Sequence, residues 1–581
     1  MTIPQRLSAL RAAMTARGWA AYIITGTDPH DSEYVPARWE TRAWISGFTG
    51  SAGLVVVTRD AAGLWTDGRY HLQAEKQLAG SGVALFRDGL PGTPQPTAWL
   101  SAELPRGAEI GVDARSVTWN RLQRWRAELG PAGLSVAAGE DLFDGVWTDR
   151  PEAPRGRIED YEIPGVTPRA EKLAAVRRSL AQHGADACLV TALDDLAWLF
   201  NLRGSDIDFT PVFLGWARVA QDSAVLYTRP GASPPALPGV ETAPYERFES
   251  DLAQGGRLLV SQERANARVL SLLQTAGTAW IDAQPLALMK AKKSAGELNL
   301  VRQAHRKDGA ALVDFLASFD DLAASGTLTE SAAAHALDAA RERRGGYRGP
   351  SFTAIPGFRE HGAVIHYRAE GEGARIDGRG LFLLDTGAQY LQGTTDVTRT
   401  LTVGEPAPEE IEDYTLVLKA HVQVSLMPFP VGTRGYMLDA LARHVLWKTG
   451  RNYGHGTGHG VGQFLSVHEG PARLNTEPVP FALEPGMILS NEPGLYRPGR
   501  YGIRIENLVT VVEGAATDFG AFLRWETLTL CPYERRLIDT ALLEPDERAW
   551  IDAYHARVLD EIGPLVGAEA RSWLETACRP L

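Results

Sequence analysis

Apolar residues recur at helical spacing near the N-terminus and then give way to short apolar runs. Leu7, Leu10 and Met14 predict one buried face of a helix, and a strand is predicted from Ala20 to Thr25. Strand character resumes in WISGFTGSAGLVVVT, and LWTDGRYHLQAEKQL predicts a strand that passes through Asp67-Gly68 into a helix. This alternation predicts an α/β layer with mostly parallel strand pairing.

The same alternation begins again after a polar, proline-containing segment, VWTDRPEAPRGR, that is typical of a linker. The segment EKLAAVRRSLAQHGADACLVTALDDLAWLFNLRG again predicts a helix, a glycine, an apolar strand, a polar turn and a second helix. A loop is expected from Pro230 to Pro238. We interpret residues 1–155 and 156–293 as two tandem α/β domains produced by one duplication.

A different pattern fills residues 294–581. Ser294 is a predicted N-cap, with Glu297 at the capping-box position of a long helix. Three more helices are predicted, at Glu330–Arg344, Pro408–Met427 and Arg434–Thr449. Short apolar strands lie between them and continue to about Val512, which predicts an α+β domain with helices packed on an antiparallel sheet.

Composition places the chain among ordinary globular proteins, with 44% hydrophobic and 22% charged residues. At roughly 100–200 residues per domain, the length of 581 residues predicts three domains. No apolar run approaches the roughly 20 residues that cross a bilayer, and the N-terminus lacks the apolar core of a signal peptide. We therefore expect a cytoplasmic protein without a membrane partner.

The charge and the cysteine content argue against a nucleic-acid-binding protein and against a fold held by disulfides or a cysteine metal site. The formal net charge of -12 argues against a nucleic-acid partner, because no basic surface is indicated. Cys188, Cys531 and Cys578 are odd in number and widely separated, so we expect neither a disulfide framework nor a CxxC metal site.

Five residues in the C-terminal half stand out by type and setting: Asp385, Asp396, His459, Glu492 and Glu506. Each carboxylate adjoins an apolar, strand-like run, where an unpaired charge would be costly. Four converging carboxylates would raise one another's pKa, and two divalent cations would cancel that repulsion. Two Asp, two Glu and one His form an oxygen-rich site that suits Mn, Co or Zn.

Each of these residues taken alone has an ordinary interpretation. Asp385 could initiate a turn, Asp396 could cap neighbouring threonine hydroxyls, and Glu492 before Pro493 could be a turn residue. Glu506 is harder to explain in this way, because its strand is strongly apolar. The metal-site hypothesis therefore rests on all five residues occurring together in this order.

The glycine-rich stretch Gly454–Gly462 contains His455 and His459, four positions apart, as in a helical zinc pair. Its glycines make a helix improbable, and it matches neither GxGxxG nor a P-loop. A loop or strand that brings the backbone close to the metals is expected instead. A serine nucleophile is disfavoured, because the sequence has no GxSxG elbow.

The segments LLDTGAQYLQGTTDVTRT, GHGTGHGVGQFLSVHEGP, ILSNEPGLY and YGIRIENLV resemble the signatures of the aminopeptidase P (Xaa-Pro aminopeptidase) and prolidase family of pita-bread metallopeptidases. SEYVPARWETRAWISGFTGSAG, WTDGRYHLQAEKQL and LTLCPYERRLID resemble the long, three-domain cytosolic form of aminopeptidase P. The resemblance spans almost the whole chain. It implies an α/β plus α+β fold, with two tandem creatinase-N-like α/β domains followed by a pita-bread catalytic domain.

The resemblance also assigns roles to individual residues. It implies that Asp385 binds one metal, that His459 and Glu492 bind the other, and that Asp396 and Glu506 bridge both. Its histidines near the scissile bond correspond to three residues, His366, His455 and His468. The glycine-rich loop would place His455 beside His459. Two further residues are interpreted as supporting ones: Arg504, expected to orient Glu506 or a neighbouring carboxylate, and His361, expected at the surface or behind the site.

The implied activity is hydrolysis of the N-terminal Xaa-Pro bond by a hydroxide held between two divalent metals, with Mn favoured and Zn or Co as alternatives. The oxyanion would be stabilised by a metal and by His366 or His455, and Glu492 or a histidine would pass a proton to the proline nitrogen. The partners implied are peptides with proline second and a second copy of the chain in a homodimer. The alternatives are a prolidase, which cuts only Xaa-Pro dipeptides, and a non-catalytic pita-bread module that binds proteins.

Overall fold

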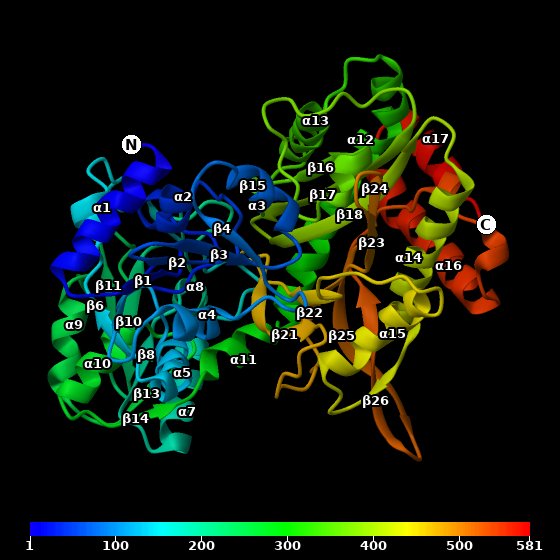
Figure 1. Ribbon diagram of the computed structural model, residues 1–581. Helices are drawn as coiled ribbons and strands as arrows, with labels where there is room; N and C mark the ends of the chain where they lie inside the picture. The colour runs from blue at the N-terminus through cyan, green and yellow to red at the C-terminus, as the bar shows by residue number, and fades with distance from the viewer. Residues whose placement is uncertain (230) are drawn as a thin grey trace. The chain divides into compact units, whose positions relative to one another are not determined.

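The computed structural model describes residues 1–229 and 231–581, which form two compact units (Figure 1). The first unit comprises Met1–Glu162 and Pro168–Leu286, and the second comprises Ile163–Thr167 and Ala287–Leu581. Pro230, the first residue of the loop expected at 230–238, lies outside the described residues.

The first unit contains two six-stranded sheets with the same strand order. The first sheet, ordered β4-β3-β2-β1-β5-β6, is built from β1 (Ala21–Ile24), β2 (Leu54–Thr58), β3 (Ala62–Thr66), β4 (Ala84–Arg87), β5 (Glu109–Asp113) and β6 (Ser135–Gly139). The second, ordered β12-β11-β10-β8-β13-β14, is built from β8 (Ala187–Val190), β10 (Gly215–Ala220), β11 (Ala224–Thr228), β12 (Glu241–Pro244), β13 (Leu258–Val260) and β14 (Trp280–Asp282).

Strand directions also agree between the two sheets. In the first, β1–β2 and β2–β3 are antiparallel, whereas β3–β4, β1–β5 and β5–β6 are parallel. The corresponding pairs of the second sheet have the same directions. Mostly parallel pairing was the expectation, and β2 departs from it because a tight turn joins it to β3, which only an antiparallel pair allows. The shared order and directions support a duplication.

One predicted strand begins later than its sequence suggested. In WISGFTGSAGLVVVT, the first three residues belong to a short helix, α2 (Thr41–Ser46), and only the last part forms β2. Gly47 ends α2 with φ 82°, a left-handed conformation that glycine adopts without strain. Trp44 and Ile45 are buried in this helix, so tertiary packing outweighs their preference for a strand.

The helices of the first unit bury the residues expected from their spacing. Helix α1 (Ile3–Ala16) buries Leu7, Leu10 and Met14, as predicted. Helices α5 (Trp119–Leu129) and α10 (Ala267–Thr275) precede the last strand of their respective sheets and contribute to one shared core, in which Leu122 and Leu270 are fully buried. The two repeats therefore pack through equivalent helices.

The second unit contains the predicted helices. Helix α12 (Ala295–Ala324) starts at the predicted N-cap, where Ser294 and Glu297 form the capping box. The other long helices are α13 (Glu330–Glu342), α14 (Pro408–Leu426), α15 (Gly435–Trp447), α16 (Pro545–Ile562) and α17 (Ala568–Ala577). No helix of the described residues is both long and apolar enough to span a bilayer.

Antiparallel sheets, also predicted, complete the second unit. In one, β17 (Gly380–Tyr390) pairs with β18 (Gly393–Val403) on one side and with β15 (Tyr347–Pro350) and β16 (Ile355–Phe358) on the other. The larger sheet, ordered β19-β26-β25-β22-β20-β21, is built from β19 (Phe429–Pro430), β20 (Gly458–Gly460), β21 (Glu469–Leu474), β22 (Ile488–Asn491), β25 (Asn507–Thr517) and β26 (Gly520–Thr527). A separate hairpin consists of β23 (Gly494–Arg497) and β24 (Tyr501–Arg504).

Strands β17 and β18 are buried along their whole length, so both of their faces are covered. Phe382 and Leu384 of β17 join the apolar cluster formed with α12 and α13, as does Val397 of β18. Because side chains alternate along a strand, Asp385 and Asp396 lie on the opposite face. The two aspartates therefore face away from these helices.

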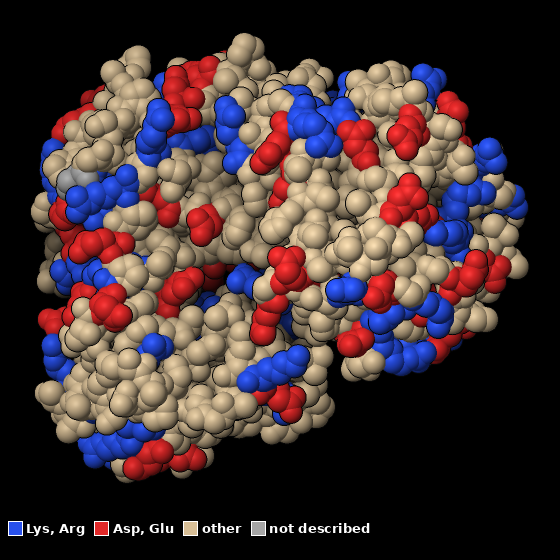
Figure 2. All heavy atoms as spheres, turned by 90° about the horizontal axis from the view of Figure 1, so that it is seen from above, with Lys and Arg blue, Asp and Glu red and all other residues tan. Residues whose placement is uncertain are grey.

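Charged side chains of both signs are mixed on the face drawn in Figure 2. Lysine and arginine side chains lie next to aspartate and glutamate side chains across that face. The net charge of -12 is therefore not concentrated there.

Candidate metal centre

The register of β17 and β18 brings two aspartates together. Asp385 pairs with Thr398, and Asp396 pairs with Gly387, two residues further along β17. The two carboxyl groups are close enough that Asp396 raises the pKa of Asp385. Neighbouring strands on one buried face thus supply the first two carboxylates.

Glu506 lies between β24 and β25 and is fastened to β18. The Thr398 hydroxyl donates to Glu506 Oε2 at 2.8 Å, and the Glu506 backbone N–H donates to the Thr398 carbonyl at 3.1 Å. Arg399 Nη1 donates to the Glu506 carbonyl at 2.6 Å. A third carboxylate is therefore fixed beside Asp396.

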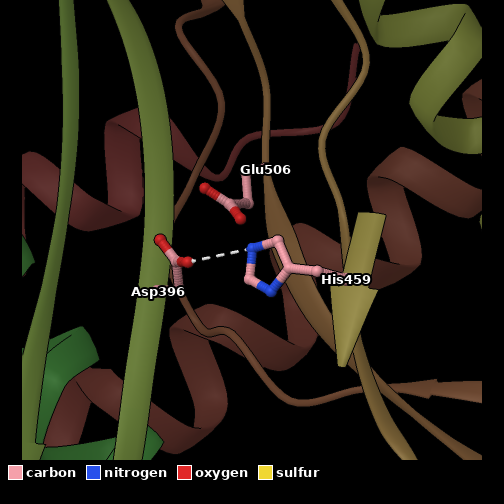
Figure 3. A group of neighbouring side chains, drawn as sticks. All are labelled: Asp396, His459 and Glu506. Carbon is pink, nitrogen blue, oxygen red and sulfur yellow. Dashed lines mark ion pairs between the residues drawn. The ribbon is translucent and has the colours of Figure 1, made fainter. Parts of the chain in front are cut away.

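His459, in β20, faces Asp396 and Glu506 (Figure 3). Its Nε2 lies 3.5 Å from Asp396 Oδ2 and 3.4 Å from Glu492 Oε1. Its Nδ1 lies 3.0 Å from the Gly460 carbonyl, and because a carbonyl only accepts, Nδ1 is the donor and Nε2 faces the acids. One ligand atom each from Asp396, His459 and Glu506 fall within 4.8 Å of one another.

Glu492 follows β22 and depends on a close approach of β20. Its backbone N–H donates to the Thr457 carbonyl at 2.8 Å, and the Ser490 hydroxyl donates to Glu492 Oε1 at 3.2 Å. A Cβ at Gly458 would lie 1.9 Å from the Ser490 carbonyl oxygen, so only glycine fits. The glycine-rich segment is thus loop and strand rather than helix, as predicted.

Burial and mutual repulsion dominate the electrostatics of the cluster. Burial, reinforced by Asp396, raises the pKa of Asp385 to about 6, although Arg504 opposes the shift. Burial also raises the pKa of Glu492, and it raises the pKa of Glu506 well above its usual range. Burial would lower the pKa of His459, but Asp396 and Glu492 raise it to about 9. The cluster lacks enough positive charge of its own.

The donor atoms fit divalent cations. Asp385 Oδ1, Asp396 Oδ1 and Glu506 Oε1 are buried and have no hydrogen-bond partner within the described part of the chain. Unsatisfied buried carboxylate oxygens are rare in folded proteins unless a ligand satisfies them. Oxygen ligands with one imidazole suit Mn, Zn or Co.

Arg504 contacts Asp385 rather than the nearer residue in sequence, Glu506. Its Nη2 donates to Asp385 Oδ2 at 2.5 Å, and its Nη1 donates to the Tyr496 hydroxyl at 2.6 Å. Tyr496 also lies 2.8 Å from His455 Nε2, while His455 Nδ1 lies 2.7 Å from the Gly456 carbonyl. A hydrogen-bonded chain therefore links His455 to Asp385.

Of the other two predicted histidines, one contacts this cluster and the other adjoins, along the chain, a residue that contacts Arg504. The His468 ring packs edge-on against His459, with ring centroids 4.3 Å apart. His366 follows Ile365, whose carbonyl accepts from Arg504 Nη2 at 3.4 Å. The expected proximity of His455 to His459 stays a prediction.

Apart from Arg504, sequence reasoning missed the residues that hold these groups in place. Tyr496, Ser490 and Thr398 are examples, and so is the pair Asp439 and Arg443 on α15. Arg443 donates to the carbonyls of Tyr453 and His455, at 2.9 and 2.7 Å, and the Thr457 hydroxyl donates to Asp439 Oδ1 at 2.6 Å. The only signal for Tyr496 was its place at the end of ILSNEPGLY.

Family comparisons match the chain from end to end. The model of metallopeptidase family M24 matches residues 299–513, and that of the C-terminal region of peptidase M24 matches residues 521–581. Models of the creatinase/prolidase N-terminal domain match residues 6–145 and 149–297. The expected fold, two creatinase-N-like domains and a pita-bread domain, is confirmed.

Individual relatives match over the same length. A probable Xaa-Pro aminopeptidase P of Laccaria bicolor is 39% identical, covering 99% of this chain and 93% of its own length. The Xaa-Pro aminopeptidase ApepP of Drosophila melanogaster is 38% identical, with coverages of 97% and 96%.

Solved structures agree with these matches. The X-prolyl aminopeptidase from Caenorhabditis elegans, described as a cytosolic enzyme with a di-nuclear active site, superposes with a TM-score of 0.95 and 33% identity over 100% of both chains. An Xaa-Pro dipeptidase from Bacillus anthracis, 25% identical with a TM-score of 0.51, covers 63% of this chain and 99% of its own. The chain therefore belongs to metallopeptidase family M24 and, within it, to the Xaa-Pro aminopeptidases.

Proposed function

We propose that the chain removes the N-terminal residue from peptides whose second residue is proline, with two divalent cations held by Asp385, Asp396, His459, Glu492 and Glu506. The observation that carries this proposal is the buried group of acids. Three of them have a carboxylate oxygen that accepts no hydrogen bond from any of the described residues. Full-length identity to Xaa-Pro aminopeptidases supports the choice of substrate.

The five residues would divide between the two ions. Asp385 would bind one ion, His459 and Glu492 the other, and Asp396 and Glu506 both. Mn is favoured by the carboxylate-rich donor set, with Zn or Co as alternatives. When bound, the cations would supply Lewis acidity, which lowers the pKa of a water nucleophile to near neutrality and polarises the scissile carbonyl.

The protein's own groups would orient the substrate and move the proton. Arg504 holds Asp385, and the Tyr496 hydroxyl connects that guanidinium to His455. His366 or His455 would donate a hydrogen bond to the oxyanion. Glu492, or a neighbouring histidine such as His468, would carry a proton to the proline nitrogen.

The chemistry of the Xaa-Pro bond explains why its hydrolysis requires a specialised enzyme. An Xaa-Pro amide has no N–H and a fixed φ, so proteases that grip an extended backbone handle it poorly. A prolidase is not favoured for this chain, because the Bacillus anthracis dipeptidase covers only 63% of it.

We also propose domain boundaries at 1–155, 156–293 and 294–581, which the matches of the family models support. A homodimer is proposed from the resemblance to the long form alone. Cytoplasmic residence is supported by the description of the Caenorhabditis elegans relative as cytosolic.

A substrate panel tests the proposed specificity. With Mn restored after chelation, kcat/KM for an Xaa-Pro-Xaa tripeptide is expected to exceed that for Xaa-Pro and for Xaa-Ala-Xaa by at least about 100-fold each, because a site shaped for one substrate loses several contacts with the others. Initial rates with each peptide give this ratio, and parallel loading with Zn and Co ranks the metals. Cleavage of the dipeptide alone would make the chain a prolidase.

A further inference from the structure

Glu330, the first residue of α13, has a buried carboxylate surrounded by hydrogen-bond donors. Its side chain is 0% exposed. Oε1 accepts from the Phe358 backbone N–H at 2.8 Å and lies 2.9 Å from His361 Nδ1. Oε2 accepts from the Tyr367 hydroxyl at 2.8 Å and from the Ala374 N–H at 2.6 Å. A carboxylate accepts about four hydrogen bonds, so this one is saturated.

All four donors belong to one segment, residues 358–374, which contains His366. The segment leaves β16, passes through the short helix η4 (Arg359–Ala363) and returns to α13, where the Glu330 N–H donates to the Ala374 carbonyl at 3.0 Å. His361 stacks on Tyr367, with ring centroids 4.5 Å apart. One side chain thus fixes both ends and the middle of the segment.

The other side of the segment contacts Arg504 and β24, which lie next to the proposed metal ligand Asp385. Arg504 Nη2 donates to the Ile365 carbonyl at 3.4 Å and to Asp385 Oδ2 at 2.5 Å. A Cβ at Gly502 would lie 1.8 Å from the Gly362 carbonyl oxygen, so β24 packs directly against η4. His366 therefore lies between two anchored neighbours, Ile365 on Arg504 and Tyr367 on Glu330.

We propose that Glu330 is a positioning residue for His366, which it holds at a fixed place relative to Asp385 without touching metal or substrate. The inference rests on the proposed catalytic role of His366. Hydrogen bonds to a transition state depend steeply on geometry, and a displacement of about 1 Å costs up to about 100-fold in rate. Loosening the segment would therefore slow turnover while the five metal-binding groups stay in place.

The test uses the Mn-loaded full-length chain and steady-state kinetics on an Xaa-Pro-Xaa tripeptide. Glu330→Gln retains the side chain's size but replaces one carboxylate oxygen by an NH2 donor, which in either amide orientation faces a backbone N–H, that of Phe358 or of Ala374. We expect kcat to fall about tenfold or more with KM within about twofold, because the loss falls on the transition state. Bound metal, measured by mass spectrometry, is expected to equal that of the unmodified chain.

Tyr367→Phe covers the case in which Glu330→Gln does not fold. It deletes one hydroxyl, and kcat is expected to fall about three- to tenfold. Tyr227→Phe is the matched control, because it deletes a tyrosine–carboxylate hydrogen bond of the same 2.8 Å length, to Asp251, in the other compact unit. Its kcat is expected to be unchanged.

A double variant separates positioning from a general structural role. If Glu330 acts through His366, Glu330→Gln placed in a His366→Ala chain is expected to slow it by less than about twofold further. The inference would be overturned, and the proposed function left standing, if the two substitutions lowered kcat by factors that multiply in the double variant. Unchanged kcat in both Glu330→Gln and Tyr367→Phe would have the same consequence. A His366→Ala chain as fast as the unmodified one would instead remove the proposed role of His366, and the inference with it.

Discussion

Asp396→Asn is expected to lower kcat/KM for an Xaa-Pro-Xaa peptide by at least about 1,000-fold, since the loss removes a ligand proposed to contact both ions. The carboxamide keeps the shape of the carboxylate but has only one acceptor oxygen and no charge. Asp396 lies 3.5 Å from His459 Nε2 and acts electrostatically on Asp385, Glu492 and Glu506. Metal analysis is expected to find at most one ion per chain.

Asp320→Asn is the control for this substitution. Its side chain lies in the same unit, is 61% exposed and pairs with Arg536 at 3.1 Å. A surface ion pair of this kind contributes little, so activity and metal content are expected to be unchanged. An Asp396→Asn chain that retained both ions and more than a tenth of the activity would contradict the proposed bridging role.

Chelation is expected to abolish turnover and to lower the melting temperature, and added Mn is expected to restore both. A ligand that binds only the folded state stabilises it by roughly 2.7 kcal/mol at 100 times its Kd. Without metal, the buried acids repel one another, and metal binding removes that repulsion. Differential scanning fluorimetry and rate measurements on the same samples report both effects.

The melting-temperature difference between loaded and metal-free protein should also grow with pH. Burial raises the folded pKa of Asp385 to about 6, so the metal-free fold holds a proton that the unfolded chain releases at lower pH. Stability of the metal-free chain is therefore lost as pH rises from about 4 through 6, and Glu492 and Glu506 shift in the same direction. A difference that shrank between pH 5 and pH 8 would contradict this electrostatic account.

Local patterns in the sequence predicted most elements of the fold. The helices and the capping box of Ser294 and Glu297 followed from spacing and residue type. Helix α2, which occupies the start of a predicted strand, did not, because the burial of Trp44 and Ile45 depends on packing that spacing does not reveal. The antiparallel placement of β2 likewise depends on a short connection within a mostly parallel layer.

The sequence predicted which residues form the candidate site, but it predicted fewer of the contacts that hold them. Its four acids and one histidine stand out because charges beside apolar strands are costly. Of their partners, Arg504 was predicted as a supporting residue, but the sequence did not assign it to Asp385, which is 119 positions away. Thr398 was not predicted as the partner of Glu506, because the two are 108 positions apart. Glu330 was hidden for the same reason, since its donors reach as far as Ala374, 44 positions away.

The central claim is that five side chains, in or directly beside separate strands, hold two cations in one buried site. Anomalous diffraction from crystals grown with Mn tests it most directly. We expect two peaks per chain, one contacted by Asp385, the other by His459 and Glu492, and both by Asp396 and Glu506. A single peak, or none among these five side chains, would contradict the account.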